Sequence, residues 1–261
     1  MKKRIIGGAI ITLITVPCFI IGKILFAIFA NLIGMLALYE LINANKDLKK
    51  IPLFIKLLSF ISIPLLAFGN LKDAYFYGID YISLIIPLIL LLVPAVLFKD
   101  KYSTKQAFIL TFISLFIGII THMYLAIFEL DKMLLLFLII IAVATDVFAY
   151  LGGRFIGKHK FSEISPNKTI EGCVTGAIFG TAAGVIYYKC LYSINNGMIL
   201  LGVVLLLSIT GQFGDLFFSK IKRDNDIKDY SDLIPGHGGI CDRIDSLTFI
   251  VMVFIIIQRY L

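Results

Sequence analysis

The sequence has too few charged and polar residues for a water-soluble protein. Only 16% of its 261 residues are charged, 59% are hydrophobic, and the mean hydropathy is +0.97. No polar stretch is long enough to fold as a separate soluble domain. This composition excludes an ordinary soluble globular protein and is typical of a chain that lies mostly in a lipid bilayer.

Cysteines are few, and the positive charge is dispersed. Cys18, Cys173, Cys190 and Cys241 show neither the CxxC pairs of a zinc site nor the density of a disulfide scaffold, so we expect reduced packing residues. The formal net charge is +7, but the basic residues are scattered in short segments between apolar runs. A nucleic-acid partner is therefore not expected, because such proteins gather their positive charge on one face.

Apolar runs recur along almost the whole chain. Because a helix needs about 20 apolar residues to cross the hydrocarbon, the sequence predicts an all-α, polytopic membrane protein with about nine transmembrane helices. Only Gly22 and Lys23 separate the first two runs, so this pair also fits a broken or re-entrant hairpin. The predicted spans are 5–21, 24–43, 52–69, 81–98, 107–128, 133–153, 171–188, 198–218 and 246–260.

The basic residues predict an orientation in the membrane. Loops on alternate sides carry 18 and five Lys and Arg residues. Because cytoplasmic loops are rich in these residues, we expect the N-terminus and the long polar segments 154–170 and 219–245 in the cytoplasm, where nucleoside triphosphates are found. Residues 1–130 then form N-terminal transmembrane helices, and residues 131–261 form C-terminal ones that carry both polar segments as catalytic loops.

The segment from Ser219 to Asp245 is the main candidate for a functional site. It holds five basic residues, six aspartates and one histidine. Gly238 and Gly239 would let backbone N–H groups approach phosphate oxygens closely. A solvated loop is the alternative, but the charge density and the His-Gly-Gly element favour a site for phosphates and cations. For His237 we favour a phosphate contact over proton transfer.

Carboxylates on two helices predict a metal site around this loop. Asp242 and Asp245 are three residues apart near the start of the last span, where a helix N-terminus favours anionic ligands. Carboxylates from two helices, with phosphates and water, suit Mg2+. If the preceding helix continues beyond residue 218, one of its faces carries four polar residues at i, i+4, i+7 and i+8: Asp215, Ser219, Lys222 and Arg223.

A second polar segment follows Asp146, an ionisable residue near the end of an apolar span. An unpaired charge deep in the bilayer costs about 2.5–3.5 kcal/mol, so such a residue is a functional candidate; solvation at the interface is the alternative. Lys158, Lys160 and Lys168 can pair with phosphates, although positive-inside anchoring explains one or two of them. Lys168 is the preferred contact.

These motifs resemble the signature of the phosphatidate cytidylyltransferase family. The resemblance covers residues 146 to 246 well and the first 130 only as a hydrophobic pattern. The sequence departs from the family at Val147 and Phe148 and at Ile170, where the family has other residue types. The matching residues are Ser219, Lys222, Arg223, Lys228, Asp229, Pro235, His237, Gly238, Gly239, Asp242, Arg243, Ile244 and Asp245, with similar residues at 211–215, 157–160, 165–169 and 171–172.

The resemblance implies transfer of a cytidylyl group from CTP to phosphatidic acid, which gives CDP-diacylglycerol and pyrophosphate. It also implies a homodimer in a bacterial-type cell membrane, Mg2+ held by Asp215 and Asp242, and in some members a second, monovalent cation such as K+. The expected catalytic residues are Asp215, Lys222, Arg223, Asp242 and Asp245. The expected substrate-binding residues are Ser219, Lys228, His237, Gly238, Gly239, Arg243, Lys168 and Asp146.

Two other functions compete with this one. The acceptor lipid could be a polyprenol-type alcohol or its phosphate, which the sequence does not exclude. A transporter or channel would also have many spans and an intramembrane aspartate such as Asp146. Transport sites, however, lie near the bilayer midplane on broken helices, whereas the polar residues here collect toward one face.

Overall fold

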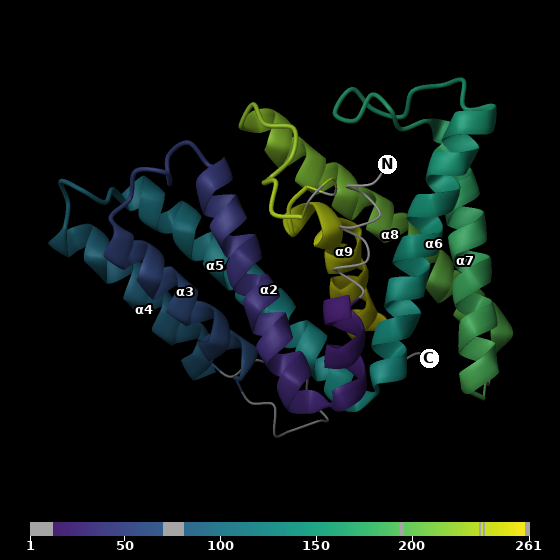
Figure 1. The fold of residues 1–261 in the computed structure, drawn as a ribbon, viewed down its shortest axis with the longest axis horizontal. Coiled ribbons are helices and arrows are strands. Elements are labelled where there is room, and N and C mark those ends of the chain that lie inside the picture. The colour runs from purple at the N-terminus through teal and green to yellow at the C-terminus, as the bar shows by residue number, and fades with distance from the viewer. Residues whose placement is uncertain (1–12, 70–80, 194–195, 235, 237, 259–261) are drawn as a thin grey trace. The chain divides into compact units, whose positions relative to one another are not determined.

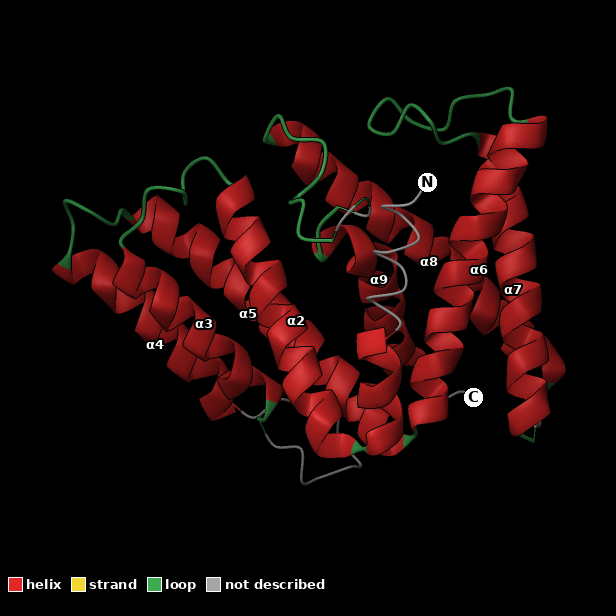
Figure 2. Cartoon of the chain, in the orientation of Figure 1, coloured by secondary structure: helices red, strands yellow, loops and turns green. Residues whose placement is uncertain are grey.

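The computed structural model describes residues 13–69, 81–193, 196–234, 236 and 238–258. Helices make up nearly all of its regular structure, as Figure 2 shows. Within the described residues, β-type pairing is limited to two isolated bridges, Lys160 with Thr169 and Ile234 with Gly238. The all-α prediction is confirmed.

A helix occupies each of the predicted apolar runs (Figure 1). Residues 13–21 are helical within the first run. The other helices are α2 (Lys23–Ala44), α3 (Leu53–Ala67), α4 (Tyr81–Leu97), α5 (Thr104–Leu130), α6 (Lys132–Ile156), α7 (Ile170–Leu191), α8 (Gly197–Asp224) and α9 (Cys241–Ile257).

Five of the described helices are long and apolar enough to cross a membrane: α2, α5, α6, α7 and α8. Helices α3 and α4 are apolar but shorter, with 15 and 17 residues. Large apolar side chains such as Ile24, Ile28 and Leu32 are exposed along α2, as expected for a surface that faces lipid. A helical membrane protein is thus supported, while the count of about nine spans stays a prediction.

The chain forms two compact units. The first contains residues 1–130 together with 225–242, and the second contains residues 131–224 together with 243–261. The loop after α8 and the first residues of α9 therefore belong with the N-terminal helices, although they follow the C-terminal ones in sequence.

In the first unit, α2, α3 and α4 pack around α5 (Figure 1). The chain breaks before α2 at Gly22, whose φ of 134° is a conformation that residues with a side chain rarely adopt. Phe19 then lies edge-on to Phe26 and Phe128, and the latter two rings stack with their centroids 3.9 Å apart. This aromatic cluster holds the segment before the break against α2 and α5.

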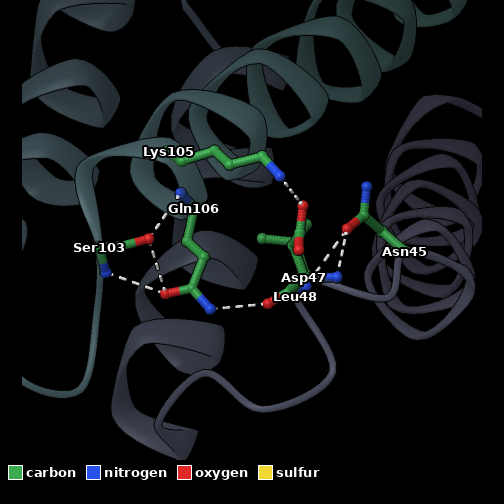
Figure 3. Close-up of polar contacts among 6 residues, drawn as sticks. All are labelled: Asn45, Asp47, Leu48, Ser103, Lys105 and Gln106. Atoms are coloured by element: carbon green, nitrogen blue, oxygen red, sulfur yellow. Dashed lines mark hydrogen bonds and ion pairs between the residues drawn. The ribbon is translucent and has the colours of Figure 1, made fainter.

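Polar contacts join the loop after α2 to the start of α5, as Figure 3 shows. Asp47 pairs with Lys105 at 2.6 Å, and its carbonyl oxygen accepts a hydrogen bond from the Gln106 side chain at 2.7 Å. Asn45 accepts from the Asp47 backbone N–H, and Gln106 accepts from that of Ser103. These contacts hold the loop after α2 against the start of α5.

In the second unit, α6 packs very closely on α7. A Cβ atom added at Gly176 would lie 2.7 Å from the carbonyl oxygen of Thr145, so only glycine allows this approach. The Thr145 hydroxyl also bonds Ser208 of α8 at 2.6 Å. The rings of Phe137 and Phe254 pack α9 against α6. These contacts hold α6, α7, α8 and α9 together in the second unit.

Candidate active site

Helix α8 carries four of the predicted site residues. It continues beyond its predicted end, so the condition for placing Asp215, Ser219, Lys222 and Arg223 along one helix is met. The Ser219 hydroxyl donates to Asp215 at 3.3 Å. Ser219 and Lys222 are buried, whereas Arg223 is exposed. Basic residues in the last turn are favourable there because the helix dipole is negative at that end.

Lys168 is held next to Asp215 by the fold of its loop. The Phe161 N–H donates to the Lys168 carbonyl oxygen at 2.9 Å, and Thr169 caps α7 by accepting from the Gly172 N–H at 3.0 Å. The Lys168 ammonium then lies 2.6 Å from the Asp215 carboxylate, with the two side chains only 22% and 27% exposed. Lys168, the preferred phosphate contact of the second polar segment, thus pairs with a residue of the predicted polar face of α8.

Charged side chains from three helices and one loop gather in the second unit. The carboxylate of Asp245 interacts electrostatically with Asp215, Asp146 and Lys222. Asp146 interacts with Asp215, Lys168 and Arg243. We call these six residues the charge cluster: Asp146, Lys168, Asp215, Lys222, Arg243 and Asp245. Its three carboxylates and three cations balance in formal charge.

Asp146 is not an isolated charge. Its carboxylate accepts a hydrogen bond from the Ser246 hydroxyl at 3.1 Å, and it interacts with the cations Lys168 and Arg243. The cost of an unpaired buried charge, on which its selection from the sequence rested, therefore does not apply. Its place in the charge cluster is now the reason to keep it as a site residue.

Asp242 shapes the loop that precedes α9 in the first unit. Its Oδ2 accepts the backbone N–H groups of Tyr230 and Gly239, each at 3.0 Å. Gly238 has φ of 80°, and a Cβ atom there would lie 2.9 Å from the same oxygen. The Ile234 N–H donates to the Gly238 carbonyl oxygen at 3.0 Å, which closes the turn. The two glycines of the signature thus allow backbone to approach a protein carboxylate.

Glu40 of α2 is a site residue that the sequence analysis missed. Its side chain is only 2% exposed. Its carboxylate accepts from the Ser231 hydroxyl at 2.5 Å, the Ile240 N–H at 2.9 Å and the Cys241 N–H at 2.8 Å. Glu40 is the one acidic residue in the predicted span 24–43, so the rule applied to Asp146 would have found it.

The N-terminus of α9 therefore differs from the expected anion site. The backbone N–H groups of Gly239, Ile240 and Cys241 donate to the carboxylates of Asp242 and Glu40. The helix dipole does attract negative charge at this end, but the protein itself supplies that charge. Phosphate contacts of Gly239 through its N–H are not favoured by this arrangement.

Lys228 is a further predicted substrate-binding residue. Lys228 is exposed in the loop after α8. Near it, Asp226 pairs with Lys46 at 2.5 Å, and this ammonium lowers the pKa of the Asp226 carboxyl group below its ordinary value. His237, for which the sequence predicts a phosphate contact, and Pro235 lie outside the described residues.

Whether these residues suit a metal ion depends on the chemistry of their donor atoms. Among the described residues, no group of three or more His, Cys, Asp or Glu residues stands together as a ready-made metal cage. Mg2+ usually takes only one or two protein carboxylates and completes its octahedron with water and substrate phosphates. Asp215 in the second unit and Asp242 in the first each carry hard oxygen donors of that kind, so the chemistry of each residue suits Mg2+, and the ion itself stays a prediction.

Comparison with known proteins identifies the family. Residues 2–261 match the model of the cytidylyltransferase family. The chain belongs to this family. A phosphatidate cytidylyltransferase of Bacillus subtilis (strain 168) is 34% identical to this cytidylyltransferase over 260 residues, which cover 96% of this chain and 95% of that protein. Those of Staphylococcus aureus (strain COL) and Staphylococcus haemolyticus (strain JCSC1435) are 34% and 35% identical over 256 and 254 residues, each covering 96% of both chains.

The match extends beyond the motifs that first indicated the family. The sequence resemblance is clear over residues 146 to 246, whereas the family match includes almost the whole of both structural units. The N-terminal helices of this cytidylyltransferase are thus part of the family fold. This agrees with the direct contact of Glu40 with the loop that joins α8 to α9 and leads into the first turn of α9, which we call the signature loop.

Proposed function

We propose that this cytidylyltransferase transfers the cytidylyl group of CTP to phosphatidic acid and so makes CDP-diacylglycerol for phospholipid biosynthesis. The observation that carries the proposal is full-length similarity to relatives named phosphatidate cytidylyltransferase. The protein is an integral membrane enzyme by its apolar helices, which suits an acceptor that is itself a membrane lipid.

The charge cluster suits a reaction between two polyanions. A phosphatidate oxygen attacks the α-phosphorus of CTP, a new P–O bond forms, the bond to the β-phosphate breaks, and pyrophosphate leaves. The nucleophile is already an anion, so no general base is required. Lys168, Lys222 and Arg243 provide positive charge to hold and align phosphates. Such alignment lowers the activation barrier mainly because the reactants lose their translational and rotational entropy on binding, before the chemical step.

Asp215 and Asp242 are the proposed holders of Mg2+. Bound there, the ion would neutralise phosphate charge and polarise the P–O bonds of CTP. The Ser219 hydroxyl keeps the Asp215 carboxylate oriented, and the Tyr230 and Gly239 N–H groups do the same for Asp242. A second cation such as K+ and a homodimer belong to the proposal on the family resemblance alone.

The orientation in the membrane also remains part of the proposal. The apolar runs support about nine spans, and the excess of Lys and Arg in alternate loops supports a cytoplasmic location for the N-terminus and the loops 154–170 and 219–245. Labelling of cysteines introduced singly at exposed loop positions, with a membrane-impermeant reagent, would test it. Reaction of both catalytic loops from the outside of intact cells would reject this orientation.

The test of the function is an assay of detergent-purified protein with CTP, Mg2+ and phosphatidate. We expect release of pyrophosphate together with formation of CDP-diacylglycerol. Incorporation of labelled CTP into a polyprenyl phosphate but not into phosphatidate would replace the acceptor, and a protein active with neither lipid would refute the proposal.

A further inference from the structure

We propose that Glu40, from the N-terminal helices, is a positioning residue that sets the geometry of the signature loop and of the first turn of α9. This inference rests on the proposed function, because it concerns the loop that carries Asp242. The Glu40 carboxylate accepts hydrogen bonds from Ser231, Ile240 and Cys241, and the last two of these lie next to predicted site residues in the sequence.

The contacts of Glu40 are those of a helix cap supplied by another helix. The first N–H groups of a helix have no partner within it and need acceptors from outside. For α9, the carboxylate of Glu40 accepts from the N–H groups of Ile240 and Cys241. An aspartate or serine next to a helix usually does this from within the same segment, whereas here the acceptor is 200 residues away in the sequence.

Burial makes these contacts strong and specific. With 2% of its surface exposed, Glu40 has little access to water, and a buried carboxylate is costly unless its oxygens accept hydrogen bonds. Three donors of one loop meet this need, since the Ser231 hydroxyl joins the two N–H groups. Moving any of them away leaves the charge less satisfied, so the loop has one strongly preferred conformation around Glu40.

Glu40 and Asp242 accept hydrogen bonds from different residues of the same loop and of the start of α9. Glu40 binds Ser231, Ile240 and Cys241, while Asp242 binds the N–H groups of Tyr230 and Gly239. The residues that Glu40 holds are direct neighbours, in sequence, of those that Asp242 holds. A shift at Glu40 is therefore transmitted to the carboxylate proposed to hold the metal. Partners that orient metal-binding carboxylates typically contribute about 10–100-fold in metal affinity or activity.

The test compares Glu40→Gln with Glu129→Gln in the purified full-length protein. Glu129 also lies in an apolar helix of the first unit, where its carboxylate pairs with Lys23. An amide at position 40 offers one acceptor where the loop presents three donors. We expect kcat/KM, per folded molecule, to fall about 10–100-fold in Glu40→Gln and to change less than twofold in Glu129→Gln. Glu40→Asp, which keeps the charge, should recover part of the loss.

Amide hydrogen exchange without substrates separates this inference from the proposed function. In Glu40→Gln, the Ile240 and Cys241 amides should exchange at least tenfold faster, with other helices unchanged. If Glu40→Gln does not fold, Ser231→Ala removes one donor and should lower kcat/KM less, by about 3–10-fold. Unchanged exchange, or faster exchange with turnover within twofold of wild type, would overturn the positioning role. Wild-type protein without turnover would refute the proposed function, while the exchange data would still decide whether Glu40 holds the loop.

Discussion

Replacement of Gly239 by alanine tests the packing of the signature loop against Glu40. The backbone of Gly239 does not have the positive φ that excludes alanine. The obstacle is steric: the added Cβ atom would lie 2.5 Å and 2.6 Å from the two oxygens of Glu40. Carbon and oxygen atoms without a covalent bond need about 3.3 Å. The carboxylate must therefore retreat by roughly 0.8 Å.

This displacement is enough to break the cap of α9. Added to the 2.8 Å and 2.9 Å bonds from Cys241 and Ile240, it gives separations of roughly 3.6 Å, which is beyond a hydrogen bond. Overpacking of a tight interior costs about 1–3 kcal/mol, and each bond to a charged group contributes about 1.5–3 kcal/mol. Because the loop can relax in part, we expect Gly239→Ala to lower the free energy of unfolding by about 2–4 kcal/mol.

The assay is chemical denaturation in detergent, with Gly202→Ala as the control. Gly202 lies in α8 with open space around its Cα, so alanine there should stabilise the helix by up to about 1 kcal/mol. In a Glu40→Ala background the clash is gone, and Gly239→Ala should then cost less than about 0.5 kcal/mol. An equal cost in both backgrounds would show that the clash with Glu40 is not the cause.

Three further predictions concern the proposed metal and the charge cluster. Asp215→Asn and Asp242→Asn should each reduce formation of CDP-diacylglycerol by at least about 100-fold while the protein stays folded. The control is Asp232→Asn, which changes an exposed aspartate. Full activity of either site variant would contradict the metal proposal. Removal of divalent cations with a chelator should abolish wild-type turnover, and added Mg2+ should restore it. Lys168→Met should lower the free energy of unfolding by about 1–2 kcal/mol and raise the KM for CTP, whereas the exposed Lys160→Met should change neither by much.

The helices were predictable from the sequence because one physical rule dominates them. Apolar runs long enough for a bilayer form helices, since every backbone polar group must be satisfied within the segment. The ends were less predictable: α9 begins at Cys241, five residues before its predicted start. Asp242 and Arg243 in its first turn are charged, and the N–H of its first residue, Cys241, donates to Glu40, so hydropathy alone does not mark this helix end.

The site residues were predictable by type, but their partners were not. Helical spacing predicted that Asp215 and Lys222 lie on one face of a helix, and both side chains interact electrostatically with the Asp245 carboxylate. The pairing of Lys168 with Asp215 joins residues 47 positions apart and depends on how the loop before α7 folds back. Glu40 is separated from the loop by about 200 residues, and no local pattern in the sequence indicates such a contact.

The hydrogen bonds of Asp242 are compatible with its proposed role as a metal ligand. A carboxylate that binds a metal is commonly held by further hydrogen bonds, which orient its oxygens and reduce their freedom. For Asp242 the Tyr230 and Gly239 N–H groups share Oδ2, so the direction of the whole carboxylate is fixed before any ion arrives. Glu40 fixes the backbone on the other side of the same turn. If Glu40 positions this turn as proposed, the N-terminal helices contribute to catalysis through the backbone of the loop, and this would give a physical reason for the family match to extend over both units.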